Sequence, residues 1–120
     1  MTQRRILLVD DNEALRLTTA ALLEDAGYEV VEADSVATGR ARLRDGSLYD
    51  AAVLDVHLGD GVGHDLFADL RELQPQAVIV LLSGTAIPEE MVGADLALTK
   101  GMPPDELLGA IARVLAARPR

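Results

Sequence analysis

The segment that decides the fold is ILLVDDNEAL, Ile6–Leu15. Its first four residues are all apolar, which is typical of a strand that is buried on both faces of a parallel sheet. Two adjacent aspartates, Asp10 and Asp11, follow directly, at the point where such a strand has to end. A buried strand that leads straight into two carboxylates indicates that one edge of the sheet carries polar chemistry.

Apolar runs alternate with segments of helical periodicity along the rest of the chain. The runs at 51–54 and 78–82 are apolar throughout, like the first, and runs at 28–33 and 96–99 complete a set of five strands. Because parallel strands need crossover connections, this alternation predicts an α/β fold. We expect a single doubly wound sheet of five parallel strands with helices on both faces.

The expected helices lie between these strands and after the last one. They are Glu13–Ala26, with Leu15, Leu22 and Ala26 on one face and a left-handed cap at Gly27; a helix capped by Ser35 that carries Val36 and Leu43; a stripe of Leu66, Phe67, Leu70 and Leu73 that stops before Pro75; and a last helix opened by Pro103, with Leu107, Leu108, Ile111, Val114 and Leu115 inward.

Composition narrows the class of protein. A chain of 120 residues has the usual size of one domain, so residues 1–120 are expected to fold as a unit. Its net charge of −9 opposes nucleic acid binding by this chain alone, since such binding needs lysine and arginine to neutralise phosphates. The absence of cysteine excludes disulfides and thiol catalysis. No apolar run approaches a membrane span, so we expect a cytoplasmic protein without membrane contact.

Polar residues follow four of the five predicted strands. Asp10 and Asp11 follow the first strand, and Asp55, Ser83 and Lys100 follow the third, fourth and fifth. In open parallel sheets, binding sites form at the carboxyl ends of the strands, so these side chains are expected at one edge. Gathered carboxylates repel one another and need a cation or shifted pKa values. Magnesium, which prefers oxygen ligands and often binds together with a phosphate, suits such a site.

Each of these residues also has a simpler interpretation. Asp11 and Asn12 are common helix-capping types, Asp55 and Ser83 are common turn residues, and an isolated lysine is most often a solvated surface residue. The coincidence of all of them at strand ends favours a phosphoryl-transfer site, where Lys100 and Ser83 contact phosphoryl oxygens. We interpret His57 and His64 as surface residues, because a metal site built on histidine side chains needs partners that this chain lacks.

With these motifs in place, the chain resembles the receiver domain of two-component response regulators. The resemblance extends from Arg4 to about Ala117 and rests, in order, on LLVDDNE, DAAVLDVHLGDGVG, VIVLLSGTA and GADLALTKG. It implies the sheet order 2-1-3-4-5, with a histidine kinase or histidine phosphotransferase as phosphoryl donor. It further implies Asp55 as the phosphorylated nucleophile, Lys100 and Ser83 as phosphoryl-binding residues, and Mg²⁺ held by Asp10, Asp11, Asp55 and the backbone carbonyl of His57.

Three departures from the family pattern concern signal output. Receivers usually carry an aromatic residue three positions before the lysine and a proline after it, whereas this chain has Ala97 and Gly101. Residues 84–99 also form a shorter connection than receivers normally have, by about a helical turn. We therefore expect the fourth helix, near Pro88–Val92, to be short or degenerate. Receivers commonly dimerise through the face formed by the fourth helix, the fifth strand and the fifth helix. Because the fourth helix is shortened, we also expect a monomer or weak dimer.

Three functions remain open at this point. The leading hypothesis is a phosphoacceptor that modifies itself, has possible autodephosphorylation and acts on no separate turnover substrate, and is thus not an enzyme in the usual sense. The second is a binding module that retains the site without switching, which Ala97 and the short connection suggest. The third is a small magnesium-dependent aspartyl phosphatase, although the closely spaced elements leave no room for a substrate-binding insert.

Overall fold

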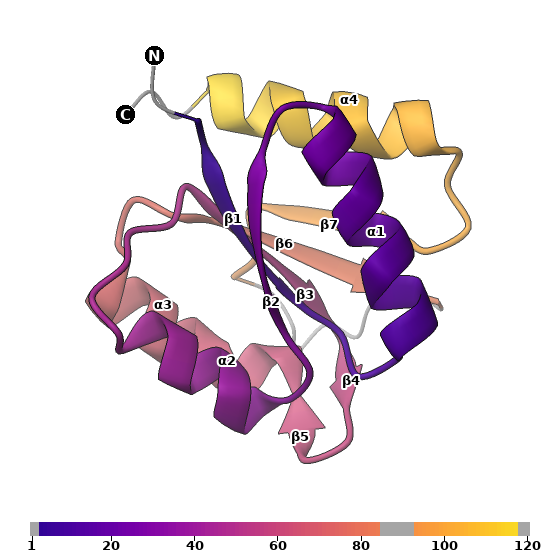
Figure 1. Ribbon diagram of the computed structural model, residues 1–120. Coiled ribbons are helices and arrows are strands. Elements are labelled where there is room, and N and C mark those ends of the chain that lie inside the picture. Colours follow the sequence, from indigo (N-terminus) through magenta and orange to yellow (C-terminus); the bar gives the residue numbers. More distant parts are fainter. Residues whose placement is uncertain (1–2, 85–92, 118–120) are drawn as a thin grey trace.

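The computed structural model describes residues 3–84 and 93–117, and within them one parallel sheet forms the centre of the molecule (Figure 1). Its strands follow the order β2-β1-β3-β6-β7. This is the predicted order 2-1-3-4-5, with β6 and β7 as its fourth and fifth strands. The bounds of these strands are Arg5–Val9 for β1, Glu29–Ala33 for β2, Ala51–Asp55 for β3, Val78–Ser83 for β6 and Leu96–Thr99 for β7.

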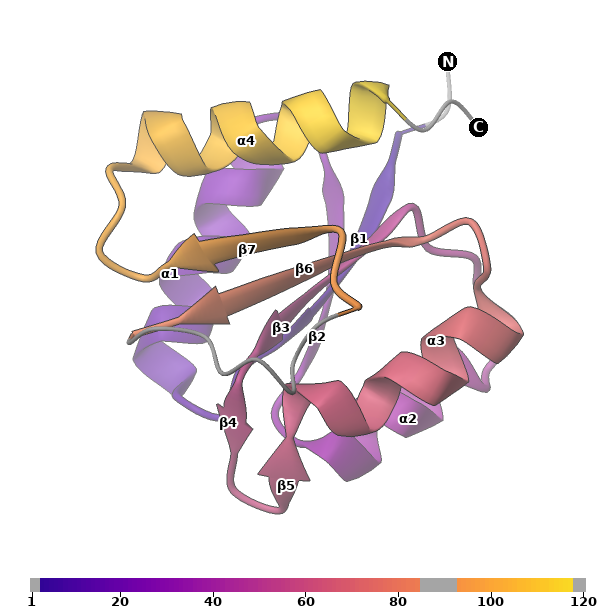
Figure 2. The same ribbon diagram turned by 180° about the vertical axis from the view of Figure 1, so that it is seen from behind.

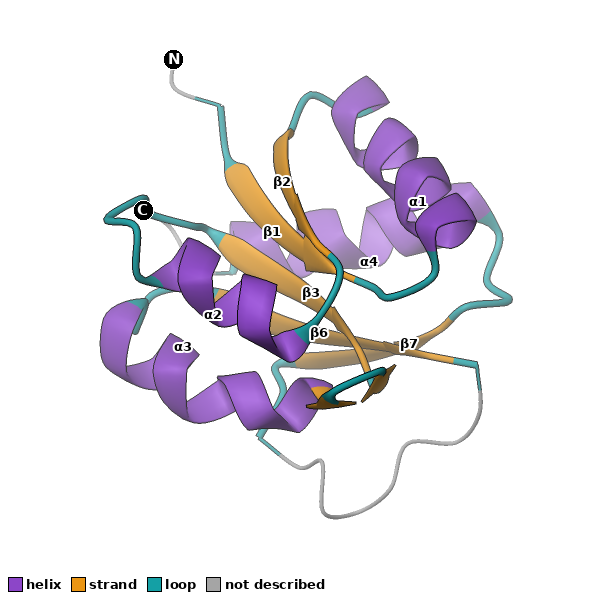
Figure 3. Cartoon of the chain, turned by 60° about the horizontal axis from the view of Figure 1, so that its bottom comes forward, coloured by secondary structure: helices purple, strands orange, loops and turns teal. Residues whose placement is uncertain are grey.

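The helices cover both faces of this sheet, as expected for a doubly wound fold. Figures 1, 2 and 3 show α1 and α4 on one face and α2 and α3 on the other. None of the described helices combines the length and the apolar composition that a membrane span requires. The bounds of the helices are Glu13–Asp25 for α1, Val36–Leu43 for α2, Phe67–Leu73 for α3 and Pro104–Ala116 for α4.

Alternate residues of the central strands supply two separate cores. On β1, Leu7 and Val9 belong to the cluster under α2 and α3, while Ile6 and Leu8 belong to the cluster under α1 and α4. This follows from the two-residue period of a strand, which sends neighbouring side chains to opposite faces. Both faces are covered, so every position of β1 except Arg5 is buried. The apolar run after Arg5 is thereby explained.

Local signals start and stop the helices where the sequence indicates. The Asn12 side chain accepts a hydrogen bond from Leu15 N–H at the start of α1, and Ser35 forms a reciprocal cap with Thr38 at the start of α2. At the end of α1, Gly27 has a φ of 100°, in the region that favours glycine. Its N–H donates to the Glu24 carbonyl, which closes the helix as predicted.

The apolar face predicted for α1 is only partly the buried one. Leu22 is half-buried, but Leu15 is 45% exposed and Ala26 is exposed, and the structure instead buries Ala20 and Leu23. Apolar residues lie on more than one side of α1, so periodicity alone does not select the buried side. Packing against β2 and α4 makes the selection, and the small Ala20 suits a close contact with the sheet.

The other predicted apolar stripes are largely confirmed. In α2, Val36 and Leu43 are both buried. The third stripe begins as a short 3₁₀ helix, Gly63–Leu66, and its last residue, Leu73, is 39% exposed. In the last helix, Leu107, Ile111 and Leu115 are buried, while Leu108 and Val114 are half-buried. The segment Pro88–Val92, where a short fourth helix was expected, lies outside the described residues.

A small hairpin after β3 was not predicted. Its strands, β4 (His57–Leu58) and β5 (Gly61–Val62), pair antiparallel and form a separate two-stranded sheet. Figure 1 shows this hairpin at the bottom of the view, beyond the end of β3 and close to α2. Two-residue strands carry too little periodicity to be recognised from sequence.

Replacing a core leucine tests whether burial on both faces stabilises the sheet. Leu54, at the end of β3, is fully buried, so Leu54→Ala is expected to lower the free energy of unfolding by about 2–5 kcal/mol. Leu48→Ala is the matched control, because Leu48 is 75% exposed and its truncation is expected to change stability by less than about 0.5 kcal/mol. Urea denaturation followed by circular dichroism measures both, and equal losses would contradict the assignment of Leu54 to the core.

Candidate metal centre

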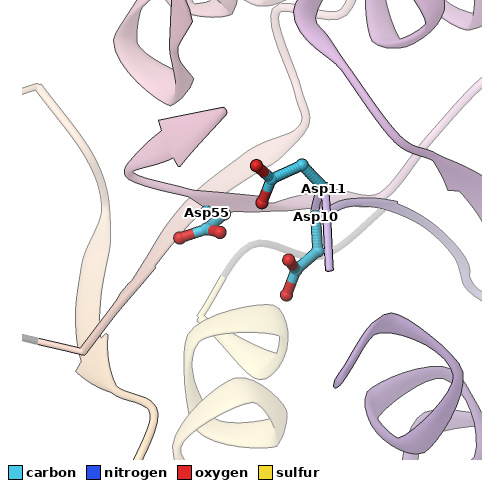
Figure 4. Close-up of side chains that lie close together, drawn as sticks. All are labelled: Asp10, Asp11 and Asp55. Atoms are coloured by element: carbon cyan, nitrogen blue, oxygen red, sulfur yellow. The ribbon is translucent and has the colours of Figure 1, made fainter. Parts of the chain in front are cut away.

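Three carboxylates meet at the carboxyl ends of β1 and β3. Asp10 and Asp11 follow β1, and Asp55 is the last residue of β3. One carboxylate oxygen from each lies within 4.8 Å of the other two, and Figure 4 shows the three side chains gathered around one space. Asp10 and Asp55 are buried while Asp11 is exposed, so the cluster is open to solvent on the Asp11 side. The sequence prediction that brings these three residues together is confirmed.

The sheet register sets the distance between the two buried carboxylates. β1 and β3 are adjacent and parallel, and their pairing ends with Val9 opposite Leu54. The next residue on each strand is Asp10 or Asp55, so both side chains start from the same level of the sheet. Two chain positions far apart in the sequence thereby become neighbours.

Lys100 reaches into this cluster from the far edge of the sheet. Its Nζ donates a hydrogen bond of 3.0 Å to Asp55 Oδ2 and lies 3.7 Å from Asp10 Oδ2. The backbone fixes its position, because the Lys100 N–H donates to the Ser83 carbonyl at the end of β6. Lys100 is thus the cation that partly neutralises two buried carboxylates.

Ser83 lies one residue beyond the partner of Asp55. The β3–β6 pairing ends with Asp55 opposite Leu82, and Ser83 follows as the buried last residue of β6. Ser83 in turn pairs with Thr99, directly before Lys100. The register therefore places Ser83 at the same sheet edge as the cluster.

Burial is the main influence on the pKa of the Asp55 carboxyl. Removal from water raises the pKa of the Asp55 carboxyl, and the neighbouring Asp10 adds to that rise. The hydrogen bond and charge of Lys100 act in the opposite direction without cancelling it. Burial therefore destabilises the ionised form of Asp55, and a cation bound beside it would offset this destabilisation.

The β4–β5 hairpin is attached to the neighbouring helix by one carboxylate. Asp60, in its turn, accepts hydrogen bonds from Val36 N–H at 2.8 Å and from Ala37 N–H at 3.0 Å, at the N-terminus of α2. These bonds lower the pKa of the Asp60 carboxyl. The attachment bears on the site because the same hairpin carries His57, two residues after Asp55. Sequence reasoning missed Asp60, whose partners lie on a different element.

Both histidines are exposed, as predicted for surface residues. His57 is exposed on β4, and the His64 ring packs near the Phe67 ring, with centroids 4.6 Å apart. The role of the His57 backbone carbonyl as a metal ligand remains a prediction.

Gly63 allows the chain to pass directly behind Asp55. A Cβ atom at this position would lie 2.4 Å from the Asp55 backbone oxygen and 3.3 Å from the Leu54 Cβ. The Gly63 N–H also donates to the Val56 carbonyl at 2.9 Å. A side chain at residue 63 would therefore displace the end of β3. Nothing in the sequence distinguishes this glycine from its neighbours, and only the fold shows its close approach.

Ala97 and Gly101, the two unusual positions near Lys100, both lie within the residues that the structure describes. Ala97 is exposed on β7, where it pairs with Leu81. No cis peptide bond occurs among the residues that the structure describes, and this includes the bond before Gly101. Instead, the Met102 N–H donates to the Thr99 carbonyl, which closes a turn around Lys100 and Gly101.

Comparisons with known proteins agree with this geometry. The family pattern described as the response regulator receiver domain matches residues 6–112. The alginate biosynthesis transcriptional regulatory protein AlgB of Pseudomonas putida is 36% identical over 97% of this chain. The matched segment makes up only 27% of AlgB, so the chain spans about a quarter of that relative.

Solved structures of response regulator proteins are also similar to this chain. A CheY-like receiver domain protein from Methanospirillum hungatei aligns with a TM-score of 0.89 and 31% identity, over 98% of this chain and 97% of that one. The response regulator protein TrrA from Thermotoga maritima, in complex with Mg²⁺-BeF, aligns with a TM-score of 0.84 and 25% identity, over 93% of this chain and 99% of that one.

The close approach at Gly63 is testable by adding one methyl group. Gly63→Ala is expected to lower the free energy of unfolding by about 1–3 kcal/mol, because the backbone behind Asp55 must move. Gly59→Ala in the same hairpin is the control, since its Cβ would meet no atom closer than Asp11 Oδ2 at 4.0 Å, and we expect a change below about 1 kcal/mol. If thermal and urea denaturation showed the two variants to be equally stable, the close approach would have no energetic consequence.

The raised pKa of Asp55 predicts that the wild type and Asp55→Asn differ in stability, in the presence of a chelator, by an amount that depends on pH. Below the ordinary aspartate pKa, about 3.9, both the folded and the unfolded wild type are protonated at this group, so the two proteins differ least. As pH rises through the raised pKa, the folded wild type acquires the costly ionised form while the variant does not. The stability advantage of Asp55→Asn is therefore expected to grow with pH and then level off.

Urea denaturation at a series of pH values measures this difference. A stability advantage that shrinks as pH rises would show that the attraction of Lys100 outweighs the burial of Asp55.

Proposed function

Because this chain belongs to the family of response regulator receiver domains, we propose that it accepts a phosphoryl group on Asp55 from a phosphohistidine donor, with Mg²⁺ bound beside the acceptor. The observation that carries the proposal is the cluster of Asp10, Asp11 and Asp55 with Lys100 at 3.0 Å from the acceptor. Its oxygen-only donor set suits a hard divalent cation. The similar TrrA structure, which holds Mg²⁺-BeF, supports the same choice of metal.

The transfer needs little covalent chemistry from the protein. A carboxylate oxygen of Asp55 forms a bond to phosphorus, the bond between phosphorus and the donor imidazole breaks with its electron pair on nitrogen, and that nitrogen takes up a proton from water. When bound, Mg²⁺ neutralises charge on the transferring group and on the carboxylates. Asp55 thereby becomes an aspartyl phosphate.

The chain's own residues divide the remaining tasks. We assign Asp10, Asp11, Asp55 and the His57 backbone carbonyl to metal binding, and Lys100 and Ser83 to the phosphoryl oxygens. Lys100 already contacts Asp55 Oδ2, so it needs to move only a short distance from the carboxylate to a phosphoryl oxygen. A lysine suits this task because its ammonium group is a compact charge on a flexible stem.

The partner classes follow from this chemistry. We assign the donor role to a histidine kinase or histidine phosphotransferase, and the cytoplasm as the place of transfer. Receiver domains are generally phosphoacceptors and not enzymes, and we propose that this chain likewise acts on no separate turnover substrate. Residues 1–120 would form the receiver unit, as a monomer or weak dimer, and the output would come from partner binding or from a larger parent protein.

One observation favours a second candidate, a binding module that keeps the site without switching. Ala97 lies exposed on β7 and has no ring that could change its position. The two candidates differ in one measurable property, which is whether Asp55 becomes phosphorylated.

Intact mass spectrometry after incubation with a small phosphoryl donor and Mg²⁺ tests the proposal. We expect the mass gain of one phosphoryl group in the wild type, no gain in Asp55→Asn, and no gain with a chelator. Lys100→Met is expected to slow the reaction by about 100-fold, because one charge that stabilises the transferring group is lost. No gain in a wild type that binds Mg²⁺ would favour the binding module, and turnover of a phosphate ester well above stoichiometry would indicate a phosphatase.

A further inference from the structure

Arg16 links the turn that carries the candidate metal ligands to the outer strand of the sheet. It lies in the first turn of α1, and its Nη1 donates a hydrogen bond of 3.0 Å to the backbone carbonyl of Asp10. Its Nε donates at 3.0 Å to Glu32 Oε1 on β2. The Arg16 side chain is 15% exposed and the Glu32 side chain 36%, so these two contacts are partly shielded from solvent.

These contacts complete the fixation of Asp10. Its N–H donates to the Ala33 carbonyl at 3.1 Å, and its Oδ1 accepts a hydrogen bond of 2.9 Å from the Asn12 N–H. With Arg16 on its carbonyl, Asp10 is held through its amide, its carbonyl and one carboxylate oxygen. The other oxygen, Oδ2, lies 3.7 Å from Lys100 Nζ, inside the cluster. The orientation of Asp10 is therefore set by hydrogen bonds outside the cluster.

The shape of the guanidinium group explains why an arginine stands here. Two of its nitrogens donate in different directions at the same time, one to a carbonyl and one to a carboxylate. The Glu32 carboxylate neutralises the arginine and fixes the plane of its group. A lysine would reach only one of the two acceptors with comparable geometry.

We propose that Arg16, oriented by Glu32, is a positioning residue that holds Asp10 in the geometry needed to bind the divalent cation. The inference rests on the proposed function, because the cation is the Mg²⁺ assigned there. Groups that orient metal ligands without touching the metal commonly change metal affinity by about 10–100-fold when they are removed. Arg16 has the contacts required for such a role.

The sign of the effect separates positioning from simple charge. Arg16 is a cation near three carboxylates, so its charge alone opposes the binding of another cation. If charge were its only influence, removing it would strengthen Mg²⁺ binding. If it positions Asp10, removing it weakens Mg²⁺ binding in spite of the lost repulsion.

The chain offers a matched control in Arg42. Arg16 and Arg42 line the same hollow of about 250 Å³, together with Glu32, Ala33, Asp34 and Thr38. Arg42 donates to the backbone carbonyl of Glu32 at 3.4 Å, and Arg16 alone of the two makes a hydrogen bond to Asp10 among the described contacts. Arg42→Met therefore removes the same charge from the same surface without releasing Asp10.

Isothermal titration calorimetry of the whole chain with MgCl₂ measures the affinity directly. Arg16→Met is expected to raise the Mg²⁺ dissociation constant about 10-fold or more, and Arg42→Met to change it less than about twofold. An unchanged or lower dissociation constant in Arg16→Met overturns the inference. So does an equal loss in Arg42→Met. A wild type that does not bind Mg²⁺ overturns the proposed function as well, which distinguishes the two failures.

A double-mutant cycle with Glu32→Gln tests how Glu32 acts. Glu32→Gln alone is expected to weaken Mg²⁺ binding, and to have little further effect once Arg16 is methionine, because Glu32 acts through Arg16. Equal losses in both backgrounds would show that Glu32 contributes only its charge and would overturn its orienting role.

Two further measurements separate positioning from a general loss of structure. Urea denaturation in a chelator identifies the variants that remain folded, and Arg16→Lys replaces Arg16→Met if the latter does not fold. Arg16→Lys keeps the charge and loses one contact, so a smaller rise in the dissociation constant is expected, and an unchanged value overturns the inference. The Asn12 amide donates to Asp10 Oδ1, so its hydrogen exchange reports on how firmly Asp10 is held. In the folded variant, exchange at Asn12 is expected to be faster than in the wild type, while exchange at the amides of β3 is expected to stay unchanged.

Discussion

Burial of the parallel sheet on both faces is the constraint on which the other features depend. β3 and β6 are buried at every position, so these strands offer no surface for polar chemistry along their length. Polar groups are admitted only where the strands end. Because the strands are parallel, these ends lie at one edge and gather side chains from distant parts of the sequence. The same constraint that stabilises the domain therefore creates the site.

The site itself is held in an electrostatically unfavourable state. Asp10 and Asp55 are both buried, and burial raises the pKa of Asp55. Lys100 relieves part of the repulsion from the end of β7, but one ammonium group faces three carboxylates. Under the proposed function, this excess of negative charge at a fixed position is what a divalent cation would neutralise.

The surroundings of the cluster carry as much of the design as the cluster. Asp60 attaches the β4–β5 hairpin to the N-terminus of α2, Gly63 lets the chain pass behind Asp55, and Arg16 fixes the backbone of Asp10. Each of these residues joins two elements and contributes no carboxylate oxygen to the cluster. The exposed Ala97 is a different kind of feature, because it changes the edge strand β7 and leaves the cluster intact. The carboxylate cluster and the edge strand β7 are therefore separate features of the structure.

The sequence alone determined the five strands of the main sheet, their order through the family resemblance, and the residues of the cluster. Apolar runs such as Ile6–Val9 and the polar residues after them are local signals, and parallel pairing translates them directly into one edge. Only the tertiary structure decided that Ala20 and Leu23, and not Leu15, face the core, and that Arg16, Asp60 and Gly63 support the site. The physical reason is that these roles depend on contacts between segments distant in the chain, which no local pattern of residues encodes.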